Sequence, residues 1–365
     1  MDFVNRSTLP AAWTLGFDPD GRELVVVAIK ATFTIPLPGE LPRLADEQVQ
    51  LIEADQFTGE PGVSAPLYET DFAHRKPCCD VLLNASAYAP GGRPTRQVTV
   101  GARIGQVAKA FIVKGPRQWQ ERLVTVVAGT PEPFVSLPIS YDVAYGGVDA
   151  SAGNPNDVKT YLTNPAGRGY SRSDAALPNT EEIGHPVVDR GGNYRPMSFG
   201  PIGRAWKPRF GWAGTYGQRW LDERAPFWPA DFDTRYFQAA PPDQQMPYLR
   251  GGEEITLHNL TPHARVDFHV PRLHLPLLLV RHRGPDEQLE PVIDTILLEP
   301  DLGRFTLIWR ATVPMRRSCF DLRELVVGQA RGAPYRLRRP SNRPRRTLDE
   351  LVRLRRRALR AEAAS

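Results

Sequence analysis

The sequence of 365 residues contains little cysteine, no long apolar run and no recognisable nucleophile motif. Its three cysteines, Cys78, Cys79 and Cys319, are too few for a disulfide framework, which favours a reducing compartment and predicts a cytoplasmic protein. No apolar run approaches the roughly 18 residues of a membrane span, so we expect no membrane partner. The first residues, Met1 to Gly21, lack a basic stretch followed by an apolar one, and we therefore expect no secretory signal.

Proline and glycine, by contrast, are abundant. The chain contains 36 prolines and 30 glycines, and its proline content is about twice the usual frequency of about 5%. Proline is poorly tolerated inside helices, and both residues favour turns. The composition therefore predicts many short strands and ordered loops. We expect a mainly β protein with antiparallel, sandwich-like regions, and we expect residues 1–330 to form its β-rich domain.

Three sub-regions differ in composition and in hydrophobic pattern. Residues 1–137 and 248–330 contain β-branched runs such as ELVVVAIKATFTI (Glu23 to Ile35) and LEPDLGRFTLIWR, which reads as a strand, a tight turn and a strand. Residues 138–247 are instead rich in glycine, proline and aromatic residues and hold four of the seven tryptophans. We expect this middle segment to be irregular but packed, with a short helix near Thr215 to Glu223, because a disordered segment would contain few aromatic residues.

The positive net charge of +5 belongs to the end of the chain. Residues 331–365 contain 12 arginines and three carboxylates, a net +9, so the first 330 residues carry −4. We interpret residues 331–346 as an Arg/Pro-rich linker and residues 347–365 as a basic amphipathic helix that begins with a capping box at Thr347 and Glu350. Leu351, Val352 and Leu359 form its partial apolar stripe. We expect this tail to dock on an acidic partner protein, although a flexible arm is the alternative, and we expect no nucleic acid because the body is acidic.

The stretch FGPIGRAWKPR (Phe199 to Arg209) poses a choice between a phosphate cradle and a structural corner. A cradle needs backbone amides at a helix N-terminus, whereas the prolines here prevent a following helix and no Ser or Thr stands at the metal position. We therefore predict a corner that buries Trp206 and in which Arg204, like Arg168 of NPAGRGY, bonds to nearby carbonyls or carboxylates. The candidate residues for lining a partner groove are Arg168, Gly200, Pro201, Gly203, Arg204, Trp206, Trp220 and Asp222.

Histidine and carboxylate clusters offer two further hypotheses. Four histidines, His258, His263, His269 and His274, are spaced by five or six residues. This spacing fits neither helical nor strand metal sites, so we expect surface histidines and no metal.

The segment WLDERAPFWPADFD, residues 220–233, combines carboxylates with aromatic residues, as a sugar cleft does. It is equally typical of a turn-rich segment with Asx caps. A carbohydrate-binding or carbohydrate-active protein is therefore the alternative function.

Several phrases together resemble a bacterial family known as domain of unknown function 2169 (DUF2169). The resemblance covers about Asp2 to Met315 and rests on AAWTLGFDPDGRELVVVAIKATFTI, FTGEPGVSAPLYETDFAHRKPCCDVLLNASAYAPGG, PISYDVAYGGVD, NPAGRGY, LPNTE, FGPIGRAWKPR, AGTYGQRWLDERAPFWPADFD and YFQAAPPDQQ. Members of that family sit beside type VI secretion genes and look like adaptor chaperones that load effectors onto PAAR or VgrG spike proteins. The resemblance thus implies a non-catalytic adaptor without a cofactor, whose partners are an effector toxin, a spike protein, or both. It implies no catalytic residue that could be carried over to this chain.

Overall fold

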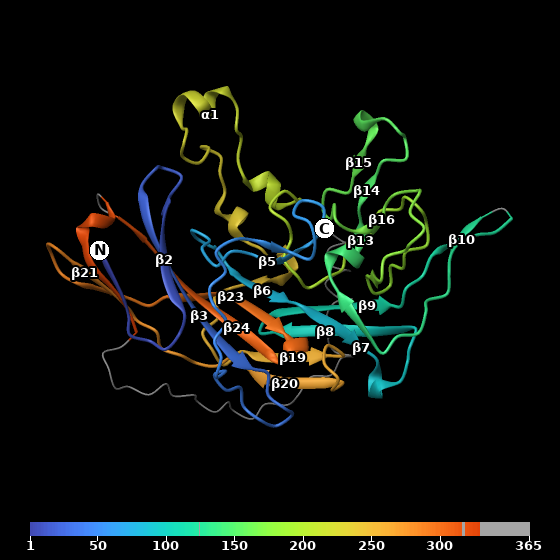
Figure 1. The fold of residues 1–365 in the computed structure, drawn as a ribbon, viewed down its shortest axis with the longest axis horizontal. Coiled ribbons are helices and arrows are strands. Elements are labelled where there is room, and N and C mark those ends of the chain that lie inside the picture. The colour runs from blue at the N-terminus through green and yellow to red at the C-terminus, as the bar shows by residue number, and fades with distance from the viewer. Residues whose placement is uncertain (124, 316–317, 329–365) are drawn as a thin grey trace.

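The computed structural model describes residues 1–123, 125–315 and 318–328, and it confirms the predicted mainly β fold (Figure 1). The strands are β1 (Asp2–Asn5), β2 (Ala11–Phe17), β3 (Glu23–Thr34), β4 (Gln56–Phe57), β5 (Pro66–Tyr68), β6 (Cys79–Leu83), β7 (Ala85–Tyr88), β8 (Gln97–Ile104), β9 (Val107–Lys114), β10 (Trp119–Glu121), β11 (Val126–Ala128), β12 (Ser136–Ile139), β13 (Tyr145–Gly146), β14 (Val148–Asp149), β15 (Lys159–Thr160), β16 (Arg168–Gly169), β17 (Thr180–Glu181), β18 (Gln245–Met246), β19 (Glu254–His258), β20 (Arg265–His269), β21 (Leu277–Arg281), β22 (Glu287–Leu289), β23 (Val292–Glu299), β24 (Arg304–Pro314) and β25 (Leu322–Val327). Most pairs are antiparallel, and the parallel pairs are β1 with β25, β6 with β23, and β13 with β16.

Helical elements are short, as the proline content predicts. The α-helix α1 (Gln218–Glu223) lies inside the range in which the sequence predicts a short helix. The 3-10 turns are η1 (Pro90–Gly92), η2 (Tyr141–Val143), η3 (Pro155–Asp157), η4 (Arg209–Trp212), η5 (Thr234–Phe237), η6 (Pro242–Gln244), η7 (Pro300–Leu302) and η8 (Cys319–Asp321). In the described part of the chain, no helix has both the length and the apolar character needed to cross a bilayer.

Two large sheets enclose the main core. One has six strands in the order β18-β6-β23-β24-β3-β2, and the other has five in the order β17-β9-β8-β19-β20. Phe305 on β24 packs on Phe33 of its own sheet and on Phe268 of the other, with ring centroids 5.3 Å apart in both cases. Because β3 pairs with β24 and β8 pairs with β19, the N-terminal and C-terminal strand regions share both sheets and do not form separate layers.

The second face of the six-stranded sheet is buried although it carries charges. Side chains alternate between the two faces of a strand. In β3, β6, β23 and β24 one face carries the apolar core residues, and the opposite face carries Lys30, Asp80, Asp294 and Arg310. These side chains form nearly inaccessible ion pairs, Lys30–Asp71 at 2.9 Å, Lys76–Asp80 at 2.7 Å and Arg310–Asp294 at 2.5 Å. The irregular parts of the chain cover this face, which explains why the glycine- and proline-rich middle segment is packed.

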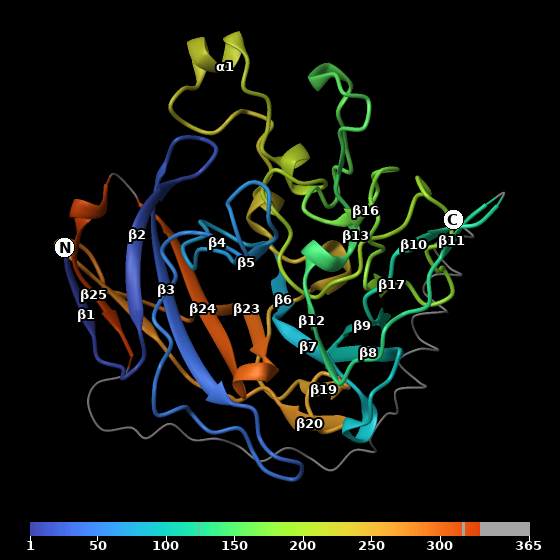
Figure 2. The ribbon, with the colours of Figure 1, turned by 45° about the vertical axis from the view of Figure 1, so that its right-hand side comes forward.

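Two segments project from the irregular cover, by which we mean the loops and turns that lie over the charged face of the six-stranded sheet. Figures 1 and 2 show the α1 loop and the β14–β15 hairpin standing above the body of the protein, with the tip of the β2–β3 hairpin close to the base of the α1 loop. Arg224 of the α1 loop donates a hydrogen bond to the carbonyl of Pro19 in that hairpin. The predicted linker 331–346 and tail helix 347–365, with Leu351, Val352 and Leu359, lie outside the described residues.

Candidate functional site

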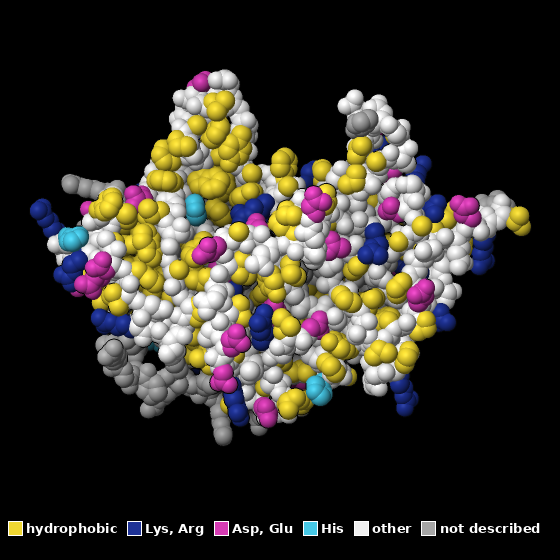
Figure 3. All heavy atoms as spheres, viewed as in Figure 1, with side chains coloured by type: hydrophobic (Ala, Val, Ile, Leu, Met, Phe, Trp, Pro, Cys, Tyr) yellow, Lys and Arg dark blue, Asp and Glu magenta, His cyan; other side chains and the backbone are white. Residues whose placement is uncertain are grey.

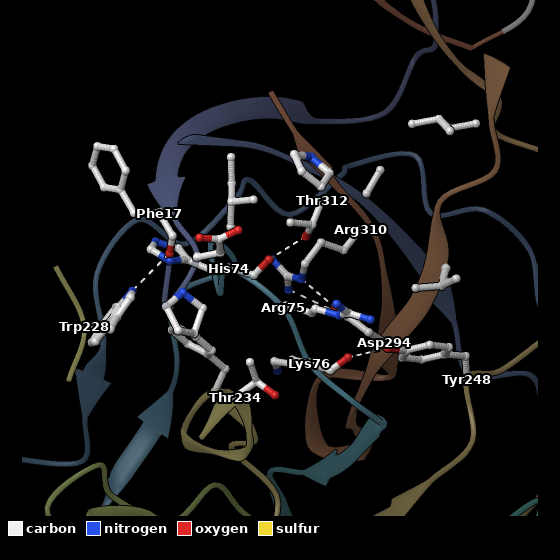
Figure 4. A pocket seen from close by; sticks show the side chains of 18 of the residues that line it. Phe17, His74, Arg75, Lys76, Trp228, Thr234, Tyr248, Asp294, Arg310 and Thr312 are labelled. Atoms are coloured by element: carbon white, nitrogen blue, oxygen red, sulfur yellow. Dashed lines mark hydrogen bonds and ion pairs between the residues drawn. The ribbon is translucent and has the colours of Figure 1, made fainter. Parts of the chain in front are cut away.

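A pocket of about 450 Å³ lies between the second face of the six-stranded sheet and the base of the α1 loop (Figure 4). Strands β3, β23 and β24 contribute Leu24, Asp294 and Arg310 to it. The irregular cover contributes His74 and Trp228 from the other side. The pocket therefore exists because a charged sheet face is covered by loops that leave one end open.

One wall of the pocket is aromatic. Trp228 stacks on Phe232 with ring centroids 4.3 Å apart, and both rings contact Phe237 edge-on. The indole Nε1 of Trp228 also donates a 3.1 Å hydrogen bond to the backbone carbonyl of Phe17. Asp233 caps the turn η5 by accepting a hydrogen bond from the backbone N–H of Arg235, so the segment that holds the wall is locally fixed.

The floor of the pocket is ionic, and its charges are paired with one another. Arg310 bonds to Asp294 and also donates to the backbone carbonyl of Asp71. Lys76 bonds to Asp80 and donates a 3.0 Å hydrogen bond to the hydroxyl of Thr295. Burial acts to lower the pKa of Lys76, but the neighbouring carboxylates of Asp80 and Asp294 outweigh it and raise that pKa above its usual value. Lys76 therefore stays charged and holds the floor together.

Arg75 is the charged lining residue that remains open to a ligand. It is exposed, and within the described ranges its guanidinium has no hydrogen bond or ion pair. The acidic lining residues have partners, since Asp18 accepts bonds from the N–H groups of its own turn and Glu290 lies 3.2 Å from His274. A ligand carboxylate could therefore pair with Arg75 at the mouth of the pocket.

His74 separates the aromatic wall from the sheet. Its ring lies against Gly16, where a Cβ atom would come within 2.7 Å of the imidazole. Burial lowers the pKa of His74, and the nearby cations Arg310 and Arg204 lower it further, so the ring is neutral at pH 7. The described residues that line the pocket include no serine or cysteine that this imidazole could activate.

In the stretch Phe199 to Arg209, for which the sequence predicts a structural corner, the arginine and tryptophan side chains are held as expected. Arg204 bonds to Asp55 and Glu69, both at 2.8 Å, and lies over the ring of Tyr236. Trp206 is buried, and its ring meets Tyr141 edge-on at 5.6 Å. In the neighbouring NPAGRGY segment, Arg168 donates a 3.1 Å hydrogen bond to the carbonyl of Asp142. The predicted bonding of both arginines is thus confirmed.

The predicted partner-groove residues are not brought together at the aromatic pocket. Gly200 lines a separate pocket of about 330 Å³, and Trp220 and Asp222 lie in the α1 loop. Asp222 accepts a 2.9 Å hydrogen bond from Gln218, and the indole of Trp220 donates to the carbonyl of Phe227. The role of these residues, and of Pro201 and Gly203, in a partner groove stays a prediction.

The carboxylates of residues 220–233 are engaged within their own segment or its immediate neighbours. Asp231 accepts bonds from the backbone and hydroxyl of Thr215, and Asp233 pairs with Arg235. Glu223 forms an exposed pair with Arg219. These contacts match the turn-capping interpretation of the segment, whereas its aromatic residues Trp228 and Phe232 contribute to the pocket.

The four clustered histidines differ in their surroundings. The sequence predicts a surface position for His258, but this prediction is wrong. The residue is buried, with 5% of its surface exposed, because it lies on the central strand β19 between β8 and β20. Burial and the nearby Arg265 lower its pKa to about 4. Among the residues that the structure describes, no group of three or more His, Cys, Asp or Glu side chains could hold a metal ion.

Sequence reasoning missed the pocket residues His74, Arg75, Lys76, Asp294 and Arg310. For Asp294 and Arg310 the available signal was a charged residue in the interior of an apolar strand, VIDTILL and LIWRAT, a pattern that VVVAIKAT and CDVLL share, whereas no such pattern marks His74, Arg75 and Lys76. Lysine, aspartate and arginine are almost never fully buried unless they are paired. Such interruptions therefore indicate a buried ionic face.

Comparison with known proteins identifies one family. The family model described as "Uncharacterized protein conserved in bacteria (DUF2169)" matches residues 20–310. No curated protein and no solved structure matches the chain.

Proposed function

Because the chain belongs to the DUF2169 family, we propose that it is a non-catalytic adaptor chaperone of type VI secretion. In this proposal it binds an effector toxin, its PAAR or VgrG spike protein, or both, in the cytoplasm before loading. The adaptor role comes from the sequence resemblance. The structural observation that supports this role is a pocket with an ionic floor and an aromatic wall. The charged side chains of the floor are paired with one another, and the wall is open.

The ionic floor supports binding more than catalysis. General acid or base work needs a titratable group that can reach a substrate and change its protonation state. In the floor, Lys76 and Arg310 each bond to a buried carboxylate, and breaking such a pair costs several kcal/mol, about 3–5. The floor is therefore better suited to fixing the shape of the site than to exchanging protons.

The surface around the pocket has the composition of a protein interface. Apolar side chains gather on the α1 loop and continue below it toward β2, as Figure 3 shows. The exposed fractions are 43% for Phe17, 53% for Tyr216, 57% for Leu221 and 36% for Phe227, and the rings of Phe17 and Phe227 meet edge-on at 5.2 Å. Contiguous exposed apolar groups near an aromatic pocket are typical of protein-binding sites. We propose that a partner inserts an apolar side chain against Trp228 and pairs a carboxylate with Arg75.

Calorimetric titration with purified partners tests this proposal. The full chain is titrated with the PAAR, VgrG and effector proteins of the same genome, and we expect at least one of them to bind. The variants Tyr216→Ala and Leu221→Ala should weaken that binding. Leu123→Ala, at an exposed apolar residue beside strand β10, should leave it unchanged.

The alternative is tested with the same preparations. If no spike or effector protein binds and the chain instead binds or hydrolyses a glycan on an array, the adaptor proposal is wrong and the carbohydrate alternative replaces it.

A further inference from the structure

We propose that the edge strand β2 pairs with an extended segment of the partner, which adds a strand to the six-stranded sheet. This inference rests on the proposed function and names the mode of binding. Strand β2 ends the sheet order β18-β6-β23-β24-β3-β2, so one side of its backbone faces away from the sheet.

The hydrogen-bond register shows which groups of β2 face outward. The N–H of Lys30 donates a 2.9 Å hydrogen bond to the carbonyl of Pro10, and β2 then pairs with β3 residue by residue. In an antiparallel pair, alternate residues bond to the partner strand, so Ala12, Thr14 and Gly16 bond to β3. Ala11, Trp13, Leu15 and Phe17 therefore point their N–H and C=O groups outward.

The bond from Trp228 confirms this direction and marks the end of the open row. The outward carbonyl of Phe17 is the acceptor of the Trp228 indole. Across the described residues, Ala11 and Trp13 have no hydrogen-bond partner for their outward groups, and the carbonyl of Leu15 has only a 3.4 Å contact with the hydroxyl of Thr14. The row of unpaired backbone groups thus runs from Ala11 to Leu15 and stops at the wall of the pocket. Strand β1 lies near β2, and Ala11 and Trp13 are half-buried, so Leu15 is the exposed member of this row.

The edge strand β20 of the other large sheet provides a contrast. There the N–H of Asn259 bonds to the carbonyl of Ala264, so the outward residues are Arg265, Asp267 and His269. Arg265 and Asp267 place paired charges along that edge, at 2.7 Å. Charged side chains on an edge strand oppose pairing with other chains. Strand β2, AAWTLGF, carries no charge in its seven residues, so it lacks this protection.

The chemistry of the edge specifies its occupant. A row of alternating backbone donors and acceptors is matched by an extended polypeptide, as in other cases of strand addition. Trp13 and Leu15 lie on the same face of the sheet, and Leu15 is exposed. Cross-strand neighbours of such residues are favourable when they are β-branched or aromatic. The partner segment is therefore uncharged, about five residues long, and apolar at alternate positions.

A random library of 12-residue peptides displayed on phage is the probe for this edge, and the full chain is the target. We expect the selected peptides to alternate apolar residues with uncharged polar residues. In amide hydrogen exchange, a selected peptide should slow the exchange of the Trp13 and Leu15 amides. Leu15→Pro removes an outward N–H and the exposed leucine side chain but none of the bonds from β2 to β3, and it should weaken peptide binding about tenfold or more. His269→Pro makes the same change on β20 and should leave binding unchanged.

A second variant guards against misfolding of the proline variant. Leu15→Lys keeps the N–H but places a charge on the edge, and it should also weaken binding. Selected peptides that bind both Leu15 variants as tightly as the native chain would refute the inference. Protection of the Trp13 and Leu15 amides from exchange in the free chain would also refute the inference. A dimer that is detected by light scattering and dissociated by Leu15→Pro would refute it as well. In both cases the chain itself would already occupy the edge.

The outcomes separate this inference from the proposed function. If the spike and effector proteins bind the native chain and the Leu15 variants equally, the adaptor proposal stands and strand addition is wrong. If selected peptides protect β2 but no spike or effector protein binds, strand addition stands and the type VI role is wrong.

Discussion

The indole of Trp228 bonds to the backbone carbonyl of Phe17, a residue 211 positions earlier in the chain. This bond fastens the irregular segment to the margin of the six-stranded sheet and fixes the aromatic wall of the pocket beside strand β2. The pocket therefore borders the end of strand β2 at Phe17. The α1 loop projects from the body near the tip of the β2–β3 hairpin (Figure 1).

Trp228→Phe should measure the contribution of this bond. The variant keeps an aromatic ring but loses the donor, and we expect the free energy of unfolding in urea to fall by about 1 kcal/mol. Trp220→Phe is the matched control, because its indole donates to Phe227 within the exposed α1 loop, which can open without global unfolding. Equal losses in both variants would show that the Trp228 bond has no special role in fastening the segment.

The buried pair of Arg310 and Asp294 should be far more important for stability than an exposed pair. Arg310→Met leaves Asp294 buried without this partner, and we expect a loss of about 3 kcal/mol or more in the free energy of unfolding. Arg219→Met breaks the exposed pair with Glu223 and should cost less than about 0.5 kcal/mol. The double variant Arg310→Met, Asp294→Leu should recover much of the loss. If Arg310→Met is as stable as Arg219→Met, the ionic floor is not a structural element.

Glycine substitutions test the structural corner. A Cβ atom on Gly203 would come within 2.7 Å of the Trp206 indole, and overpacking of this kind costs about 1–3 kcal/mol. A Cβ on Gly200 meets only ordinary contact, 3.8 Å from the side chain of Asn84, so Gly200→Ala should be nearly neutral for stability. Thermal unfolding of the two variants compares them. A stable Gly203→Ala variant with weakened partner binding would instead place Gly203 in the partner groove.

His258 predicts a pH dependence of stability. Its pKa of about 4 in the folded protein lies below the value of about 6.5 expected in the unfolded chain. Between these values the unfolded state binds the proton more readily, so the stabilising contribution is complete above about pH 6.5 and is lost as the pH falls toward 4. His258→Gln should reduce the loss of stability between pH 7 and 4, measured as the urea midpoint at each pH. An unchanged profile would mean that His258 does not titrate differently on folding.

The β class of the protein could be predicted from the sequence, but the site could not. Strand β20, residues 265–269, can be recognised in the sequence because Val266 and Phe268 alternate with polar residues. In the structure the burial of its side chains alternates in the same way. Lys30 illustrates the limit. Its charge within an apolar strand indicates a buried partner, but that partner is Asp71, which lies 41 residues away in an irregular segment. No local pattern encodes such a pairing.

The pocket escaped prediction for the same reason. Residues His74 and Trp228 come together only because separate loops cover the same sheet face, and their ring centroids lie 5.9 Å apart. The carboxylates around Trp228 suggest a sugar cleft in the sequence, but Asp231 bonds to Thr215 and Asp233 to Arg235. The aromatic residues Trp228 and Phe232 form the wall instead.

Affinity purification from the native bacterium tests the adaptor proposal most directly. The tagged full chain serves as bait, and its captured proteins are quantified against those of a bait with Tyr216→Ala and Leu221→Ala. We expect a PAAR or VgrG spike protein, or a type VI effector, to be enriched on the native bait and depleted on the variant. Capture of none of these proteins, or equal capture by both baits, would contradict it.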